Sequence, residues 1–140
     1  MRPRRKKTFD VALGSTNASP NERFRVAFDP MLLVRETAAH LYPKSQAIIF
    51  FSVDEGKNAY GATRMENGEA VITIDLLTPL GRVPEILAHE IAHAVVGIDK
   101  KHGNEWKKAF GAIHKEFDRR MRLLAKRHHL KRVKPACSGR

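Results

Sequence analysis

The sequence predicts one α+β domain, and two observations lead to this fold class. Short β-branched and aromatic runs bounded by turn residues occupy the middle of the chain, and segments with the apolar spacing of a helix stand on both sides of them. The length of 140 residues, with 42% hydrophobic and 29% charged residues, suits a single globular domain. We therefore expect a basic flexible arm over residues 1–28, the domain over 29–128 and a basic flexible tail over 129–140.

A helix and then a strand are predicted in the first third of the chain. Asp29 followed by Pro30 is typical of a helix start, and Pro43 forbids continuation, so we expect a helix over residues 30–42. Residues 46–53 contain a β-branched and aromatic run between turn formers, which predicts a buried strand.

A hairpin is predicted next. Residues 60–65 and 69–76 flank Asn67 and Gly68, a pair whose tolerance of positive φ suits a tight turn. With the preceding strand, these two arms predict a small sheet of three strands.

Two helices are predicted in the second half. Pro84 suits the first residue of a helix and Gly97 suits its C-cap, so one helix is expected to end near residue 96. Asn104 is expected to cap a second, longer helix. Its apolar face has helical spacing and consists of Trp106, Phe110, Ile113, Phe117, Met121 and Leu124.

Residues 89–93 read His-Glu-Ile-Ala-His and fall within the first of these two helices. Positions i and i+4 lie one turn apart on one helix face, so His89 and His93 can present imidazoles to a single metal ion. Glu90 can reach a water molecule on that metal without binding the metal itself. The motif therefore supplies two ligands and a general base.

A catalytic zinc site needs a third protein ligand and an open position for water. We expect His102 as this ligand, because the loop after Gly97 can reverse the chain and Gly103 allows a tight path. Trp106 is suited to wall the site. Three carboxylates remain as alternative ligands: Asp99, Glu105 and Glu116.

These residues resemble the SprT-like family of zinc metallopeptidases. The family pattern is HExxH followed by His-Gly-x-x-aromatic, and here His102-Gly103-Asn104-Glu105-Trp106 follows the first half after eight residues. The likeness covers about residues 28–125. It implies a minimal zincin-like domain with zinc on His89, His93 and His102 and with Glu90 as general base. It also implies cleavage of proteins, in several members proteins bound or crosslinked to DNA.

Two departures from the family pattern stand out. Some members carry a cysteine zinc ribbon after the catalytic domain, which Cys137 alone, the single cysteine of this chain, does not build. The spacing from His93 to His102 is also short, so we expect no substrate-gating insert at that point.

The net charge of +11 lies at the two ends of the chain. Residues 1–7 hold five Lys or Arg and residues 119–140 hold nine, with no acidic residue in either segment. All 15 acidic residues and the other 12 basic residues lie in 8–118, which has a net charge of −3. Basic ends attract polyanions by counterion release, so we expect DNA or RNA as a partner; the alternative is that they only aid solubility.

The apolar runs are short. The longest, over residues 47–51, is far too short to cross a bilayer, and no apolar signal-peptide core follows the basic start. We expect a cytoplasmic protein, including one associated with a nucleoid or nucleus, and no membrane partner.

The expected function is hydrolysis of peptide bonds by a zinc-activated water, on proteins associated with nucleic acid. An extended substrate is expected to pair with an edge strand, in one arm of the hairpin at 60–76. The residue that stabilises the oxyanion stays open between Tyr60, Arg64 and His114. The rival hypothesis is a non-catalytic, zinc-stabilised nucleic-acid-binding module.

Overall fold

The helices and strands follow the predicted order in the computed structural model, which describes residues 19, 23, 24, 26, 28–53 and 60–127. The predicted tail at 129–140 lies outside these residues, as does all but five positions of the predicted arm at 1–28. The elements are α2 (Pro30–Leu41), β1 (Ala47–Ser52), β2 (Gly61–Glu66), β3 (Glu69–Asp75), α3 (Val83–Val96) and α4 (Asn104–Arg127), with short 3-10 helices η2 (Leu80–Arg82) and η3 (Ile98–Lys100). The α+β class is confirmed.

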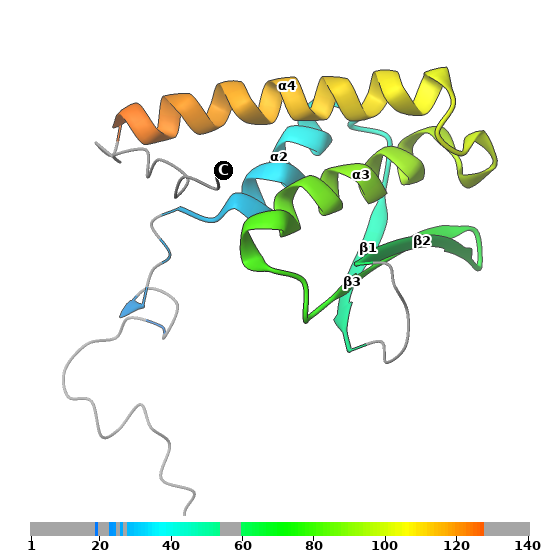
Figure 1. Cartoon of the computed structure of the whole chain (residues 1–140), viewed down its shortest axis with the longest axis horizontal. Coiled ribbons are helices and arrows are strands. Elements are labelled where there is room, and N and C mark those ends of the chain that lie inside the picture. Colours follow the sequence, from blue (N-terminus) through cyan, green and yellow to red (C-terminus); the bar gives the residue numbers. More distant parts are fainter. Residues whose placement is uncertain (1–18, 20–22, 25, 27, 54–59, 128–140) are drawn as a thin grey trace, which may run out of the picture.

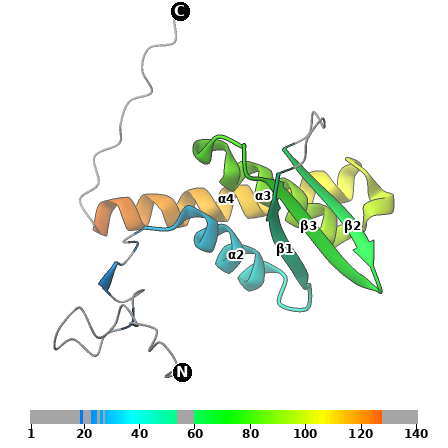
Figure 2. The ribbon, with the colours of Figure 1, turned by 90° about the horizontal axis from the view of Figure 1, so that it is seen from below.

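Helix α3 lies in the middle of the fold. The sheet lies on one side of it, and α2 and α4 pack on the other (Figure 1). Figure 2 shows the opposite face of the sheet, which no helix of the described chain covers. A helix with neighbours on two sides is apolar around most of its circumference, as the sequence of α3 is.

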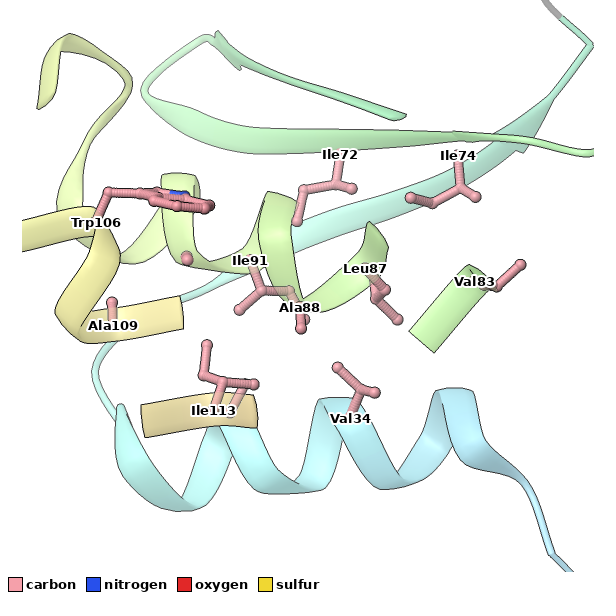
Figure 3. Close-up of a cluster of buried hydrophobic side chains, with 12 residues drawn as sticks. Val34, Ile72, Ile74, Val83, Leu87, Ala88, Ile91, Trp106, Ala109 and Ile113 are labelled. Atoms are coloured by element: carbon pink, nitrogen blue, oxygen red, sulfur yellow. The ribbon is translucent and has the colours of Figure 1, made fainter. Parts of the chain in front are cut away.

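The core consists of side chains that reach α3 from both sides (Figure 3). Ile72 and Ile74 of β3 approach α3 from the sheet, whereas Val34 of α2 and Ile113 of α4 approach it from the opposite side. All four are fully buried, and each such side chain stabilises the fold by about 1.5–3 kcal/mol. These contacts hold α3 in a fixed position.

The ends of α2 and α3 follow the predicted capping pattern. The Asp29 carboxylate accepts hydrogen bonds from the backbone N–H groups of Met31 (3.0 Å) and Leu32 (3.2 Å), which confirms the N-cap. Helix α3 begins at Val83, one residue before the predicted start. Gly97 ends it with a φ of 99° and donates its N–H to the His93 carbonyl.

Helix α4 begins at Asn104, one residue before the start that a capping role for Asn104 would give it. Asn104 is already its first helical residue, and the carbonyl of Gly103 accepts the first helical hydrogen bond, from the N–H of Lys107 at 3.0 Å. Gly103 therefore takes the capping position, and the expected capping role of Asn104 is wrong.

The sheet has the order β1-β3-β2. Strand β1 pairs with β3 in parallel, and β2 pairs with β3 as the predicted antiparallel hairpin. Asn67 and Gly68 have φ values of 51° and 79°, as a tight hairpin turn requires. The central strand is therefore β3.

The prediction of a buried strand over 46–53 is wrong. Strand β1 forms an edge of the sheet, and Ile48, Phe50 and Phe51 are 39%, 52% and 45% exposed. An apolar run favours a strand, but the pairing decides its burial. Because β3 inserts between the other two strands, it takes the buried place.

The described chain contains no helix with both the length and the apolar composition that crossing a bilayer needs.

Candidate metal centre

The three predicted ligand histidines converge on one point. The Nε2 atoms of His89 and His93 lie 3.3 Å apart, and the Nε2 atom of His102 lies 3.1 Å from each of them. His89 and His93 stand one turn apart on α3, and His102 follows η3 in the loop before α4. This loop brings the third imidazole back against the helix, as the sequence predicted.

Hydrogen bonding alone does not account for this triangle. A ring nitrogen either donates or accepts, so three mutually adjacent Nε2 atoms cannot satisfy all three of their pairwise contacts. A shared cation satisfies all three lone pairs at once. Ligand bonds of about 2.0–2.1 Å at tetrahedral angles place two nitrogens about 3.3–3.4 Å apart. The observed distances of 3.1–3.3 Å fit such an ion, so the three histidines lie close enough to bind a metal.

Trp106 forms the wall behind the three imidazoles. Its ring centre lies 4.6 Å from the ring centres of both His89 and His102, and its indole N–H donates to the His89 carbonyl at 3.2 Å. Phe110 stacks on Trp106 at 5.1 Å with an interplanar angle of 6°, and its ring centre also lies 6.1 Å from that of His89. Because Trp106 is buried, it fixes the start of α4 against the ligand-bearing helix.

The electrostatics favour neutral ligand imidazoles. Burial lowers the pKa of both His89 and His93 below the ordinary 6.5; the Glu90 carboxylate raises it and the neighbouring His102 imidazole lowers it further. A metal ligand must carry a free lone pair, so a lowered pKa keeps these rings ready to bind at neutral pH.

Glu90 lies beside the triangle without joining it. Its residue is 7% exposed, and its charge acts on both His89 and His93, but its oxygens are not part of the group of ligand atoms that lie together. This placement suits a group that handles a proton next to a metal rather than a group that binds it.

The three alternative ligands are not part of the cluster. Glu105 forms an ion pair with Lys100 at 3.5 Å. Glu116 accepts hydrogen bonds from Arg119 and Arg120, which lower the pKa of its carboxyl group to about 2. Asp99, in η3, is likewise absent from the group of converging ligand atoms.

The three oxyanion candidates have different surroundings. Arg64 points to the face of the sheet away from α3, where it binds Glu66 and Thr73. The ring of Tyr60 lies 5.2 Å from the Arg82 guanidinium. His114 on α4 contacts Phe110 and Asp118. Among the described residues, none of the three contacts a ligand imidazole through a hydrogen bond, an ion pair or stacked rings.

Two residues of β2 belong to the site although the sequence did not single them out. Thr63 hydrogen bonds to the Glu90 carboxylate, and Gly61 lies so close to α3 that an added Cβ would stand 2.9 Å from Ile86 and 3.1 Å from Glu90. A glycine inside a predicted strand is a signal of close backbone approach. The partner at that approach becomes visible only in the fold.

Residue Lys101, next to the third ligand, has an unusual backbone conformation. Its φ of 48° and ψ of −134° fall outside the small left-handed region open to residues with a Cβ. The carbonyl of Ile98 accepts the Lys101 N–H, and the Gly103 N–H binds the Lys100 carbonyl. These bonds hold a strained turn that presents His102.

No protein-family model matches the chain, and a search of curated proteins also found no match. The assignment of a function therefore depends on the chemistry of the site itself.

Proposed function

We propose that the chain is a zinc-dependent peptidase of the SprT-like type, with a minimal zincin-like domain. One observation carries the proposal: three Nε2 atoms within 3.3 Å of one another, with the nearly buried carboxylate of Glu90 beside them. A structural zinc site is closed by four protein ligands, whereas a catalytic one keeps a position open. Three imidazoles without a fourth ligand atom among the described residues match the second type.

Zinc is the metal that this ligand set suits best. Imidazole suits zinc as a ligand, and three imidazoles with an open fourth position are one of the ligand sets found in catalytic zinc sites. Copper and nickel prefer flatter arrangements, and magnesium and calcium prefer oxygen ligands. His89, His93 and His102 would hold the ion.

The proposed mechanism divides the work between the metal and Glu90. A zinc ion held by His89, His93 and His102 would supply Lewis-acid chemistry toward the peptide carbonyl and toward a water molecule. Glu90 takes the proton from the attacking water and later delivers it to the amine that leaves. Trp106 closes the rear of the ligand set and excludes water from that side.

The free edge of β2 is the proposed place for the substrate backbone. Of the two hairpin arms, β3 is paired on both sides, which leaves β2 as the arm whose second edge no described strand pairs with. An extended peptide can add to such an edge through main-chain hydrogen bonds, which carry little information about sequence. We therefore expect weak selectivity for the residues that are cleaved.

Proteins bound to nucleic acid are the proposed substrates. The last turns of α4 hold five basic and no acidic residues from position 119 onward, and this charge continues along the rest of the sequence. Such a segment binds phosphate by counterion release and can recruit the domain to DNA or RNA. The bound proteins then lie within reach of the site.

Replacing Glu90 by Gln tests the proposed base. The variant is expected to keep zinc and to lose cleavage of a denatured protein by about 10²- to 10⁴-fold, since general base catalysis is typically worth that much. Glu105→Gln is the matched control, because Glu105 lies in an exposed ion pair with Lys100. Cleavage at the wild-type rate by Glu90→Gln would exclude Glu90 as the base.

Metal analysis tests the ligand set. The purified chain is expected to hold one zinc ion. Loss of a residue that only supports a metal ligand typically lowers metal affinity about tenfold to a hundredfold, so loss of the ligand itself in His102→Ala is expected to lower zinc affinity by at least about a hundredfold. His114→Ala is the control, since His114 lies outside the triangle. Equal zinc content in all three proteins would remove His102 from the site.

The rival function is a nucleic-acid-binding module in which zinc only pins α3 to the His102 loop. The basic end of α4 is the observation that favours it. It predicts DNA binding without any cleavage of DNA-bound or unfolded proteins by the zinc-loaded chain.

The contribution of the basic end of α4 to DNA binding is tested by substitution. Helix α4 continues to Arg127, so the triple change Arg122→Gln, Lys126→Gln and Arg127→Gln removes three of its charges and keeps the helix at full length. Loss of three phosphate contacts reduces the salt slope of DNA binding by about 2.7.

A further inference from the structure

The strand beside the metal centre makes one direct bond to the proposed base. The Thr63 hydroxyl lies 2.5 Å from Oε2 of Glu90 and 3.1 Å from the Glu90 carbonyl oxygen. The hydroxyl has a single proton, and the shorter distance assigns it to the carboxylate. We propose that Thr63 is a positioning residue, which fixes the carboxylate of Glu90 relative to a peptide docked on β2. This inference rests on the proposed peptidase function.

The alternation of β2 explains why Thr63 reaches the helix. Side chains of a strand point to alternate faces, so Gly61, Thr63 and Met65 face α3, whereas Ala62 and Arg64 face away. At Gly61 the absence of a Cβ allows the strand to approach Glu90 within van der Waals distance. The close approach then brings the short side chain of Thr63 to the carboxylate.

The main-chain N–H and C=O groups of Thr63 lie in the plane of the sheet and point toward its free edge. The Asp75 N–H donates to the Tyr60 carbonyl at 2.8 Å, so Tyr60 and Asp75 stand at a hydrogen-bonded position of the hairpin. In an antiparallel pair such positions alternate, so the main-chain groups of Gly61, Thr63 and Met65 point away from β3. Thr63 thus offers its main chain to a docked peptide and its side chain to the base.

This arrangement gives the two carboxylate oxygens different tasks. Oε2 is held by the hydroxyl, which leaves Oε1 as the oxygen that can accept the proton of the water. Without the hydroxyl the carboxylate can rotate, and a misplacement of about 1 Å in a reacting group can cost about a hundredfold in rate. The effect belongs to kcat, because neither the zinc ligands nor the main chain of β2 changes.

The test compares Thr63→Val, which removes the hydroxyl at constant shape, with Thr63→Ser, which keeps it. On the zinc-loaded full chain, Thr63→Val is expected to lower kcat about tenfold to a hundredfold with KM and zinc affinity within about twofold. Thr63→Ser is expected to recover kcat to within about threefold of wild type. Thr73→Val is the matched control, because Thr73 lies on the far face of the sheet, where it accepts from Arg64. If Val is not accommodated, Thr63→Ala against Thr63→Ser makes the same comparison.

A second measurement needs neither metal nor substrate. In the metal-free protein, Thr63→Val is expected to lower the urea midpoint in the wild-type background and to have a smaller effect beside Glu90→Ala. Equal shifts in both backgrounds, or wild-type kcat in Thr63→Val, overturn the role of Thr63 alone. A wild-type chain with zinc that cleaves no protein overturns the peptidase, and with it any role of Thr63 in catalysis.

Discussion

The two edge strands of the sheet differ in their side chains, because β1 is apolar along most of its length whereas β2 begins with three small residues beside the metal centre. Strand β1 exposes bulky apolar side chains at Ile48, Phe50 and Phe51. Strand β2 begins with Gly61, Ala62 and Thr63, and it lies directly against the helix that carries the ligands. Small side chains permit the close approach that one hydroxyl can bridge. In this fold the small residues of β2, rather than the apolar run of β1, mark the strand that contacts the proposed base.

The largest expected effect is the response of metal binding to pH. Strand β1 contains no ionisable side chain, whereas β2 contacts Glu90, the residue next to the ligand His89. Burial lowers the pKa of His89 and His93, so both stay neutral until the pH falls below 6.5. Below that value zinc affinity is expected to fall by up to about a hundredfold per pH unit, because two imidazoles take up protons.

Chelator competition between about pH 5 and about pH 8 measures this slope. The metal-free protein should also lose stability as the pH falls below 6.5, because the unfolded chain binds protons at these positions more readily than the folded chain. The control His114→Ala should show the same profile. A zinc affinity that does not change with pH would contradict histidine ligation.

A direct comparison of the two edges comes from one substitution on each. Gly61→Ala places a Cβ 2.9 Å from Ile86 and 3.1 Å from Glu90, so β2 or the carboxylate must move. The rate of cleavage is expected to fall about a hundredfold while zinc stays bound. Phe51 of β1 and Gly61 of β2 both pair with Ile74 of β3, so they stand at matching positions on the two edges. Phe51→Ala should leave the rate of cleavage within about twofold of wild type. Similar losses in both variants would mean that the edges are equivalent.

A smaller effect is expected at the strained turn that presents His102. Lys101→Gly removes the steric cost of a φ of 48° with a ψ of −134°, and strain of this kind is worth about 1–3 kcal/mol. If the turn opens when no metal is bound, the change raises zinc affinity about threefold to tenfold. Asn67→Gly is the control, because Asn67 also has a positive φ but lies in the hairpin turn. Chelator competition on both variants checks the result, and unchanged affinity in Lys101→Gly would show that the turn is rigid without metal.

The smallest effect is expected on the outer face of β2. Arg64 binds Glu66 and Thr73 there, whereas its neighbour Thr63 faces the base. Arg64→Ala should change stability by less than about 1 kcal/mol and the rate of cleavage by less than about twofold, because an exposed ion pair contributes little. A loss of rate comparable with that of Gly61→Ala would return Arg64 to the list of oxyanion candidates.

Much of the site was predictable because its geometry is local. The spacing of His89 and His93 places both rings on one helix face in any α-helix, and Gly97 and Gly103 mark the turn that returns His102 to it. The positive φ of the hairpin turn also follows from Asn67 and Gly68 alone. Each of these features depends on the backbone conformation of a few neighbouring residues, and the identity of those residues is enough to predict it.

Other features depend on which distant segments pair, and the tertiary structure alone decided them. The order β1-β3-β2 exposes an apolar strand that the sequence predicts to be buried, and it makes β2 rather than β3 the open arm of the hairpin. The same pairing turns Thr63 toward Glu90, 27 positions along the chain, and Arg64 away from it. The order and register of the strands depend on how all the strands and helices pack together, so they cannot be predicted from a short stretch of residues.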